Sequence, residues 1–290
     1  MRTLDIRHVT TYRYRRDVVL GPHRLMLRPR ASHDVRLMTT ELSCHPAADM
    51  SWTYDVFGNS IAWASFAEPA ATLAIESRIR LELYATDWPV FQIAPQAHRY
   101  PFRYDDDDRA DLAALALPQY SDPEGTLKLW ALGFVHGTEA DTLSLLKDIN
   151  AGISGWIRYQ SRSDEGTQPP LESLRRGTGS CRDMVLLMAE AVRHLGLGAR
   201  IVSGYLFIPP AETSWACAPG TTHAWLEVYL PGAGWIPFDP TNRAMGGANL
   251  IPVAVVRDIR QAVPISGSFT GVPDDLLEMT VGVTVTRLSS

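Results

Sequence analysis

The chain has 290 residues, of which 46% are hydrophobic and 20% charged, which excludes wholesale disorder, a collagen-like repeat and a disulfide miniprotein. The formal net charge is −5 without a basic cluster, so we expect no nucleic-acid partner. The sparse, odd set of cysteines, Cys44, Cys181 and Cys217, is typical of a reducing compartment, and we expect a cytoplasmic protein.

The distribution of apolar residues along the sequence does not indicate a membrane partner. The segment 1–8 has no apolar region of the kind that a signal peptide needs. No run of about 18 predominantly apolar residues occurs along the chain. We therefore expect neither secretion nor membrane insertion, and the sequence does not indicate an oligomeric state.

The first hundred residues predict a β-rich domain. Apolar and charged residues alternate between Leu73 and Tyr84, which is the period of a half-buried strand. The segment 55–59 has the composition of a turn between two strands, because Gly58 and Asn59 accept positive φ at low cost. Several short strands separated by turns favour a small β-sandwich over residues 1–104.

A composition shift at the aspartate run 105–108 predicts a solvated interdomain loop, with a linker over residues 105–125. A calcium site is not favoured, because consecutive aspartates lack the alternating ligands and turn glycine of an EF-hand loop. A second domain over residues 126–290 begins with a predicted helix that Thr138 caps and that ends near Tyr159. The alternating valines of 279–288 predict a terminal strand that we assign as a tail of this domain.

The segment 177–183 places a cysteine at the start of a second helix. Ser180 is a good N-cap, and Asp183 is positioned to reach back to the cap N–H. Cys181 then occupies the first helical position, where free N–H groups and the helix dipole favour a thiolate and can stabilise an oxyanion. The ordinary alternative is that Cys181 fills a tight corner.

Two further segments offer partners for this cysteine. Residues 224–230 and 235–238 predict a hairpin, with His223 before its first strand and Asp239 after its second. In such a hairpin both residues lie at the same end of the sheet, as a base and its orienting carboxylate require. A satisfied strand-end histidine and a plain turn aspartate are the alternatives. Trp225 and Trp235 are candidates to line the substrate site, although packing is the ordinary role for each.

The ordered set 179–183, 198–205, 223–225 and 238–241 resembles the bacterial transglutaminase-like superfamily. Segments 8–14, 27–30 and 55–59 resemble the N-terminal β-domain of its bacterial branch, and 253–271 resembles the same branch. The resemblance implies an α+β chain in which the β-domain precedes a papain-like catalytic domain. It also implies acyl transfer through a thioester, with Cys181 as nucleophile, His223 as base and Asp239 as orienting residue.

Two details qualify this resemblance. Related sequences often carry an aromatic residue, a small residue and His after Cys-Arg-Asp, where this chain has Met184, Val185 and Leu186. Tyr159, near the end of the upstream helix, is a candidate second oxyanion donor, with a core or surface role as the alternative.

The expected reaction is attack on a peptide or side-chain amide of a peptide or protein substrate, with water resolving the thioester. Transfer to an amine, as in a transglutaminase, and a binding protein on a catalytically retired fold are the alternatives. Metal binding at Cys181, His223 and Asp239 is not favoured, since the chain has no CxxC or HExxH motif. We expect no cofactor.

Overall fold

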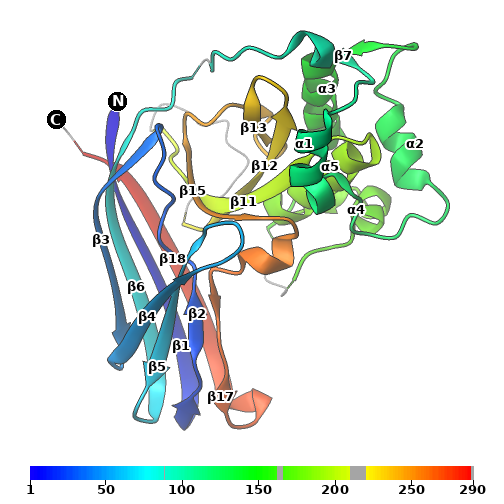
Figure 1. Ribbon diagram of the computed structural model, residues 1–290. Coiled ribbons are helices and arrows are strands. Elements are labelled where there is room, and N and C mark those ends of the chain that lie inside the picture. Colours follow the sequence, from blue (N-terminus) through cyan, green and yellow to red (C-terminus); the bar gives the residue numbers. More distant parts are fainter. Residues whose placement is uncertain (88, 162–165, 210–219, 289–290) are drawn as a thin grey trace.

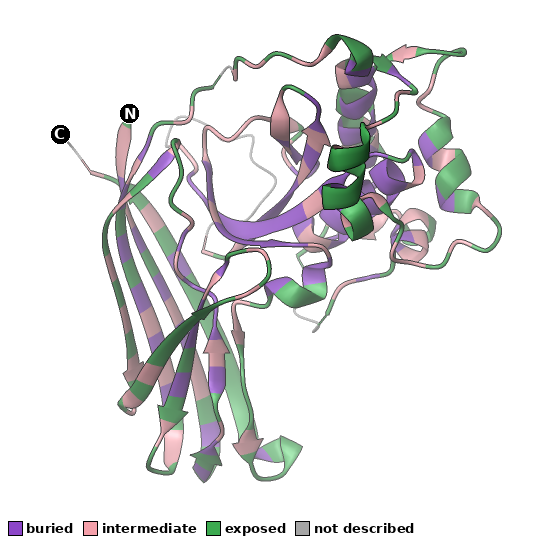
Figure 2. Cartoon of the chain, viewed as in Figure 1, coloured by how far each residue is buried: buried purple, intermediate pink, exposed green. Residues whose placement is uncertain are grey.

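The computed structural model describes residues 1–87, 89–161, 166–209 and 220–288. Its larger sheets form two regions, an elongated β-layered region and a second region in which helices cover a sheet (Figure 1). The burial pattern follows this division, because β11 and α5 are buried along their lengths while the outer strands alternate (Figure 2). The predicted α+β class is confirmed.

The longest sheet joins the two ends of the chain. Strand β1 (Arg2–Leu20) pairs with β6 (Ala70–Leu83) on one edge and with β18 (Leu276–Arg287) on the other. Strand β3 (Val35–His45) extends the sheet beyond β6, and β17 (Phe269–Thr270) pairs with the end of β1. The predicted strand over Leu73–Tyr84 is confirmed within β6.

The terminal strand is also confirmed, but its assignment to the second domain is wrong. Residues of β18 pair with β1 from Leu4 opposite Arg287 to Tyr14 opposite Leu276. The chain thus returns to the first domain and covers an edge of β1 that would otherwise expose unpaired backbone groups. Pairing between strands so distant in sequence leaves no local signal in either of them.

A second sheet packs against the first and completes the predicted sandwich. It contains β2 (His23–Leu25), β4 (Ala48–Tyr54), β5 (Ser60–Phe66) and β16 (Ile265–Ser266). The turn predicted at 55–59 joins β4 to β5, with Gly58 at φ +71°. The apolar core between the two sheets includes Leu20, Leu25, Ala62, Ala64, Leu73 and Ile75.

The third sheet has the order β14-β13-β12-β11-β15. Its strands are β11 (Ala199–Leu206), β12 (His223–Leu230), β13 (Gly234–Asp239), β14 (Ala244–Met245) and β15 (Leu250–Val256). The helices that share its core are α2 (Thr126–Leu132), α3 (Thr142–Trp156), α4 (Pro170–Arg176) and α5 (Cys181–His194). The predicted hairpin of β12 and β13 is confirmed.

The remaining short elements connect these layers. The two-stranded pairs are β7 (Arg99–Tyr100) with β8 (Ala140–Asp141) and β9 (Arg158–Tyr159) with β10 (Thr178–Gly179). The 3₁₀ turns are η1 (Pro95–Ala97), η2 (Ala113–Ala116), η3 (Ile259–Ala262) and η4 (Pro273–Asp275). Among the described residues, no helix combines the length and apolar character that crossing a membrane requires.

Two local predictions are wrong. The aspartate run forms the start of helix α1 (Asp106–Leu112), in which the Asp105 side chain accepts a hydrogen bond from the Asp108 N–H. Instead of a solvated loop, the run forms a helix start, because its carboxylates stabilise the positive end of the helix dipole. Asp105, Asp106 and Asp107 are exposed, while Asp108 accepts from the Tyr229 hydroxyl at 2.8 Å. Helix α3 begins after Asp141, which accepts from the Ser144 N–H, and not after Thr138.

The two regions share a hydrophobic core. Leu4, Ile6 and Leu81 of the long sheet pack with Tyr205, Phe207 and Ile251 of the third sheet. The buried His8 imidazole lies within this junction, with Nδ1 3.1 Å from the Tyr205 hydroxyl and Nε2 3.2 Å from Thr10 Oγ1. Burial lowers the pKa of His8 to about 4.

A second contact between the regions is made by the turn 55–59. The Asn59 side chain is fully buried, donates to the Val255 carbonyl at 2.7 Å and accepts from the Val255 N–H at 2.8 Å. This amide thus pairs with edge strand β15 as a neighbouring strand would. Arg30 holds the turn from behind by donating to the Phe57 carbonyl and to Asn59 Oδ1.

A buried ion pair holds the carboxyl end of α5. Arg193 Nη1 lies 2.8 Å from Glu190 Oε1, and both side chains are fully shielded from solvent. Glu190 Oε2 accepts from the backbone of Gln119 and Tyr120, while Arg193 donates to the carbonyls of Leu115, Ala199 and Arg257. The pair therefore connects the segment after α1 to β11 and to the residue that follows β15.

We predict that folding stability depends on pH through His8. Its pKa is about 4 in the folded chain against 6.5 for a free imidazole, so its contribution is complete above pH 6.5 and is lost as the pH falls toward 4. The expected loss is about 3 kcal/mol of unfolding free energy. Urea denaturation between these pH values measures it, and His8→Gln is expected to flatten the dependence. An unchanged slope in that variant would assign the pH dependence to other groups.

We also predict that Glu190→Ala lowers the free energy of unfolding by about 3–5 kcal/mol, because it leaves the Arg193 charge buried without its partner. Glu172→Ala is the matched control, since Glu172 pairs with the exposed Arg176 one helical turn away. That change is expected to cost less than about 1 kcal/mol. Equal effects of both variants on urea midpoints would contradict the role given to the buried pair.

Candidate active site

The first turn of α5 carries Cys181 at its start. Ser180 is the N-cap, as predicted, and its N–H and hydroxyl donate to Asp183 Oδ2 at 2.8 and 2.9 Å. Asp183 is fully buried and also accepts from the Gln168 N–H at 2.7 Å. The carboxylate therefore fixes the turn that precedes Cys181 and joins it to the segment before α4.

Cys181 is 9% exposed and packs in an apolar cluster of its own. Its other buried members are Val202 and Leu206 of β11, Trp225 of β12, and Leu250 and Val255 of β15. The nucleophile candidate thus sits where the amino end of a helix meets the sheet. Apolar neighbours exclude water from such a position, and this strengthens electrostatic interactions with the sulfur.

His223 and Asp239 meet at the end of the β12–β13 hairpin, as the sequence predicts. His223 Nε2 lies 2.7 Å from Asp239 Oδ2, and the two side chains are 2% and 1% exposed. The register explains this, because β12 and β13 pair from Leu230 opposite Gly234 to Leu226 opposite Phe238. The start of β12 and the end of β13 therefore lie at the same end of the sheet.

The thiol of Cys181 is hydrogen-bonded to the His223 imidazole. Burial lowers the pKa of His223, but the Asp239 carboxylate and Cys181 outweigh it and raise this pKa to about 10. Burial also raises the pKa of Asp239, yet the bonds from His223 and Asn242 hold it below its usual value. The Asp239 carboxylate and Cys181 therefore favour the protonated form of the His223 imidazole.

Asp239 is held by contacts that the sequence analysis did not assign. Its Oδ1 accepts from the N–H groups of Thr241 and Asn242, and its Oδ2 accepts from Asn242 Nδ2 at 2.7 Å. Asn242 is a positioning residue in this geometry. The Asp-Pro-Thr-Asn run is a turn signal from which this side-chain bond could have been anticipated.

Helix α3 supports the same turn from outside. Ser154 Oγ donates to the Pro240 carbonyl, and Asn150 Nδ2 donates to the Ala244 carbonyl at 3.2 Å. On the opposite side, Gly204 of β11 pairs with His223. A Cβ at Gly204 would overlap the Ile251 carbonyl of β15, so only glycine permits the close approach of β11 to β15 at this position.

Of the remaining predicted residues, the structure brings two to this site. Trp225 is 1% exposed and stacks on the His223 ring, with centroids 6.2 Å apart. Tyr159 pairs with Gly179 in the short β9–β10 ladder and packs, partly buried, against the cluster that contains Cys181.

The structure does not bring Trp235 to the site. It pairs with Tyr229 at the far end of the hairpin and stacks beneath the Arg200 guanidinium at 4.1 Å. Trp235 is near Asp239 in sequence but not in space, because the two residues lie at opposite ends of strand β13. Cys44 lies half-buried in β3, where burial raises the pKa of its thiol to about 11, and Cys217 lies outside the described residues.

Nothing in the described part of the chain gathers three or more His, Cys, Asp or Glu side chains for a metal ion. The side chains of this site offer the chemistry of a thiol, an imidazole and a carboxylate in hydrogen-bonded order.

Comparisons with known proteins show what the chain is similar to. Uncharacterized proteins of Mycobacterium tuberculosis and Mycobacterium bovis are each 27% identical over 288 residues, which cover 96% of this chain and 91% of theirs. The crystal structure of a candidate cysteine protease from Cytophaga hutchinsonii superposes with a TM-score of 0.74 at 19% identity, covering all of this chain and 91% of that one. The second likeness establishes the fold.

Two family models match successive parts of the chain. The bacterial transglutaminase-like N-terminal region matches residues 4–82, and the transglutaminase-like superfamily matches residues 130–240. The second match spans the helix start with Cys181, the strand start with His223 and the turn with Asp239. The chain therefore belongs to the transglutaminase-like superfamily, with the bacterial N-terminal region ahead of the core.

Proposed function

We propose that this protein is a thiol-dependent hydrolase of peptide or side-chain amides that acts through a thioester on Cys181. The observation that carries the proposal is a buried hydrogen-bonded series. Cys181, at the start of α5, is bonded to His223, and His223 is bonded to Asp239. Membership of the transglutaminase-like superfamily supports a thiol enzyme in general terms.

In the proposed acylation step, the Cys181 thiolate attacks the amide carbon and forms a tetrahedral intermediate. The N–H groups of the first turn of α5 stabilise the oxyanion, with the Tyr159 hydroxyl as a second donor. The His223 imidazolium then gives its proton to the leaving nitrogen, and the C–N bond breaks. An amine or ammonia leaves, and the acyl group remains as a thioester.

In the deacylation step, neutral His223 takes a proton from water, whose oxygen attacks the thioester carbon. The C–S bond breaks, a carboxylic acid leaves, and the thiolate–imidazolium pair is restored. Asp239 keeps the imidazole in the required tautomer and orientation throughout. We favour water as the acceptor because it needs no second binding site beside the one for the acyl group.

A product assay tests this reaction. Peptides containing internal glutamine are incubated with the full chain and a primary amine such as cadaverine, and the products are identified by mass spectrometry. Hydrolysis yields shortened or deamidated peptides, and transamidation yields cadaverine adducts. Adducts as the main product would overturn hydrolysis, and an absence of both product types across a broad peptide library would favour a binding protein.

We predict that Cys181→Ala abolishes turnover while the melting temperature changes little, because the variant removes only one sulfur atom from the cluster. Cys44→Ala is the matched control, since that thiol lies in β3 in the other region of the protein. It is expected to retain full activity. Measurable turnover by the Cys181 variant would exclude the thioester mechanism.

We predict that Asp239→Asn lowers kcat by roughly 10²–10⁴-fold, because an amide at this position selects the wrong imidazole tautomer. The backbone donors of Thr241 and Asn242 keep an acceptor in the variant, so its urea midpoint is expected to stay close to that of the parent. If the variant unfolds instead, Asp239 has mainly a structural role.

We predict that iodoacetamide labels Cys181 at a rate that varies little between about pH 6 and pH 9, as a thiolate paired with an imidazolium does. The His223 pKa of about 10 keeps the imidazolium charged over this range, and the pairing is lost as the pH rises through that value. In His223→Ala the rate should instead climb with pH, as for a thiol with a pKa of about 8.5. Cys44, with a pKa of about 11, is the slow internal reference, and equal pH profiles in both proteins would exclude the ion pair.

A further inference from the structure

Asn59 ends the turn 55–59 of the N-terminal region, and its buried side chain has every hydrogen-bonding position filled. The amide nitrogen donates to the Val255 carbonyl at 2.7 Å and to Asp55 Oδ2 at 2.8 Å. The amide oxygen accepts from the Val255 N–H and from Arg30 Nη1, both at 2.8 Å. A primary amide has two N–H donors and two acceptor lone pairs, so all four are used. The side chain is therefore held in a single orientation.

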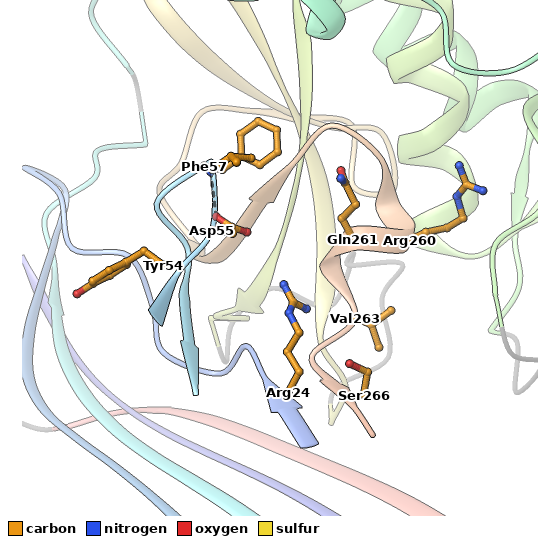
Figure 3. Close-up of a pocket in the computed structure, with 9 residues that line it drawn as sticks. Arg24, Tyr54, Asp55, Phe57, Arg260, Gln261, Val263 and Ser266 are labelled. Atoms are coloured by element: carbon orange, nitrogen blue, oxygen red, sulfur yellow. Dashed lines mark hydrogen bonds between the residues drawn. The ribbon is translucent and has the colours of Figure 1, made fainter. Parts of the chain in front are cut away.

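The turn that carries Asn59 is fixed by hydrogen bonds of its own. Asp55 Oδ1 accepts from the N–H groups of Phe57 and Asn59, both at 2.9 Å. The turn lines one side of the cavity in Figure 3, where the bond between Asp55 and Phe57 is drawn. Arg30 also donates to the Phe57 carbonyl at 2.9 Å. The turn thus presents a fixed donor and a fixed acceptor to the strand beside it.

That strand is β15, which lies at one side of the third sheet. Within the described part of the chain, β15 is the last strand of the order β14-β13-β12-β11-β15. Its outer backbone groups therefore have no strand of the sheet beside them. Asn59 binds both the N–H and the C=O of the buried Val255, and this satisfies two groups that would otherwise lack partners. A side chain of the N-terminal region thus sets the position of β15 at Val255.

The strand register connects Val255 to the candidate active site. Val255 lies opposite Val202 of β11, and Val202 lies opposite Trp225 of β12. Directly opposed residues project from the same face of a sheet, so these three side chains form a cross-strand row. Each is at most 2% exposed, and all belong to the buried cluster that contains Cys181. At the end of the row, Trp225 stacks on the His223 ring.

We propose that Asn59 is a positioning residue for the Cys181–His223 pair and that it acts through the cross-strand row. A packed interior transmits strain, so a displacement of Val255 reaches Trp225 and, through it, the imidazole bonded to the thiol. The inference rests on the proposed function and adds to it a part played by the N-terminal region. Asn59 touches neither member of the pair, and its effect on them is indirect.

The pH dependence of Cys181 labelling by iodoacetamide in the full chain tests this proposal. Asn59→Ala is expected to lower the labelling rate at about pH 6.5 by about tenfold, because the thiolate fraction falls toward that of a free thiol with a pKa of about 8.5. The profile is expected to climb with pH. Asn59→Asp keeps the shape and the acceptor but loses the donor to the Val255 carbonyl. It is expected to slow labelling in the same direction and replaces Asn59→Ala if that variant does not fold.

Leu73→Ala is the matched control for a loss of stability in the same region. Leu73 is fully buried in the core of the sandwich and lies outside the cluster that contains Cys181. Truncation of a buried leucine destabilises a protein. Urea midpoints establish that each variant is folded under the labelling conditions, and Leu73→Ala is expected to label as the parent does. Equal slowing in Leu73→Ala and Asn59→Ala would assign the effect to stability and overturn the proposal.

A double-mutant cycle tests whether Asn59 acts through the row. Val255→Ala removes side-chain packing from the row but keeps the backbone groups that Asn59 binds. Two residues that act through one route have effects that do not add. The double variant is therefore expected to label no more slowly than the slower single variant. Fold-changes that multiply in the double variant would overturn the row as the connection.

The labelling profile of the parent separates this proposal from the proposed function. If the parent labels rapidly with a flat profile and Asn59→Ala does the same, the positioning role is overturned and the thiol mechanism stands. If the parent itself labels slowly, with a rate that climbs with pH, the ion pair on which both proposals depend is overturned. Turnover of the same variants gives a further check. We expect Asn59→Ala to lower kcat with little change in KM, because Asn59 acts on the thiol and the imidazole rather than on substrate binding.

Discussion

The buried carboxylate of Asp183 is the constraint on which the site depends. It binds the Ser180 backbone and hydroxyl and the Gln168 backbone, so the start of α5 and the segment before α4 share one anchor. A helix that begins one residue later would carry Cys181 out of the first turn, where free N–H groups and the dipole act on the sulfur. The N-cap formed by Ser180 and Asp183 thus decides the position of Cys181.

The carboxyl end of α5 is also fixed by buried polar interactions. The Glu190–Arg193 pair is fully buried, and both side chains also bond to backbone groups of the segment after α1, of β11 and of the residue that follows β15. A buried ion pair is tolerated only when its hydrogen bonds are satisfied in this way. Helix α5 is therefore fixed at both ends.

The β-layered region contributes to the same assembly. Asn59 completes the edge of β15, and the side chain of Val255 on that strand packs in the cluster that contains Cys181. The core around Tyr205 joins the long sheet to β11 from another side. These contacts give the N-terminal region a physical role in supporting the core that carries Cys181, because the two regions share buried hydrogen bonds and apolar packing.

Much of the candidate site was predictable, because its parts carry local signals: a capping box ahead of Cys181, and a strand start and strand end that a short hairpin must bring together. The aspartate run shows the limit of such reasoning, since charge repulsion and helix capping make opposite predictions for the same residues and the dipole prevails. Trp235 lies away from Cys181, His223 and Asp239 because the hairpin register puts it opposite Tyr229.

The sequence by itself determined the fold class, the helix that begins at Cys181 and the hairpin that joins His223 to Asp239. Only the tertiary structure decided that β18 pairs with β1, that Asn59 completes β15 and that Asn242 holds Asp239. The physical reason is that secondary structure follows from neighbouring residues. Partners far apart in the chain are chosen by which buried backbone and polar groups would otherwise lack hydrogen bonds.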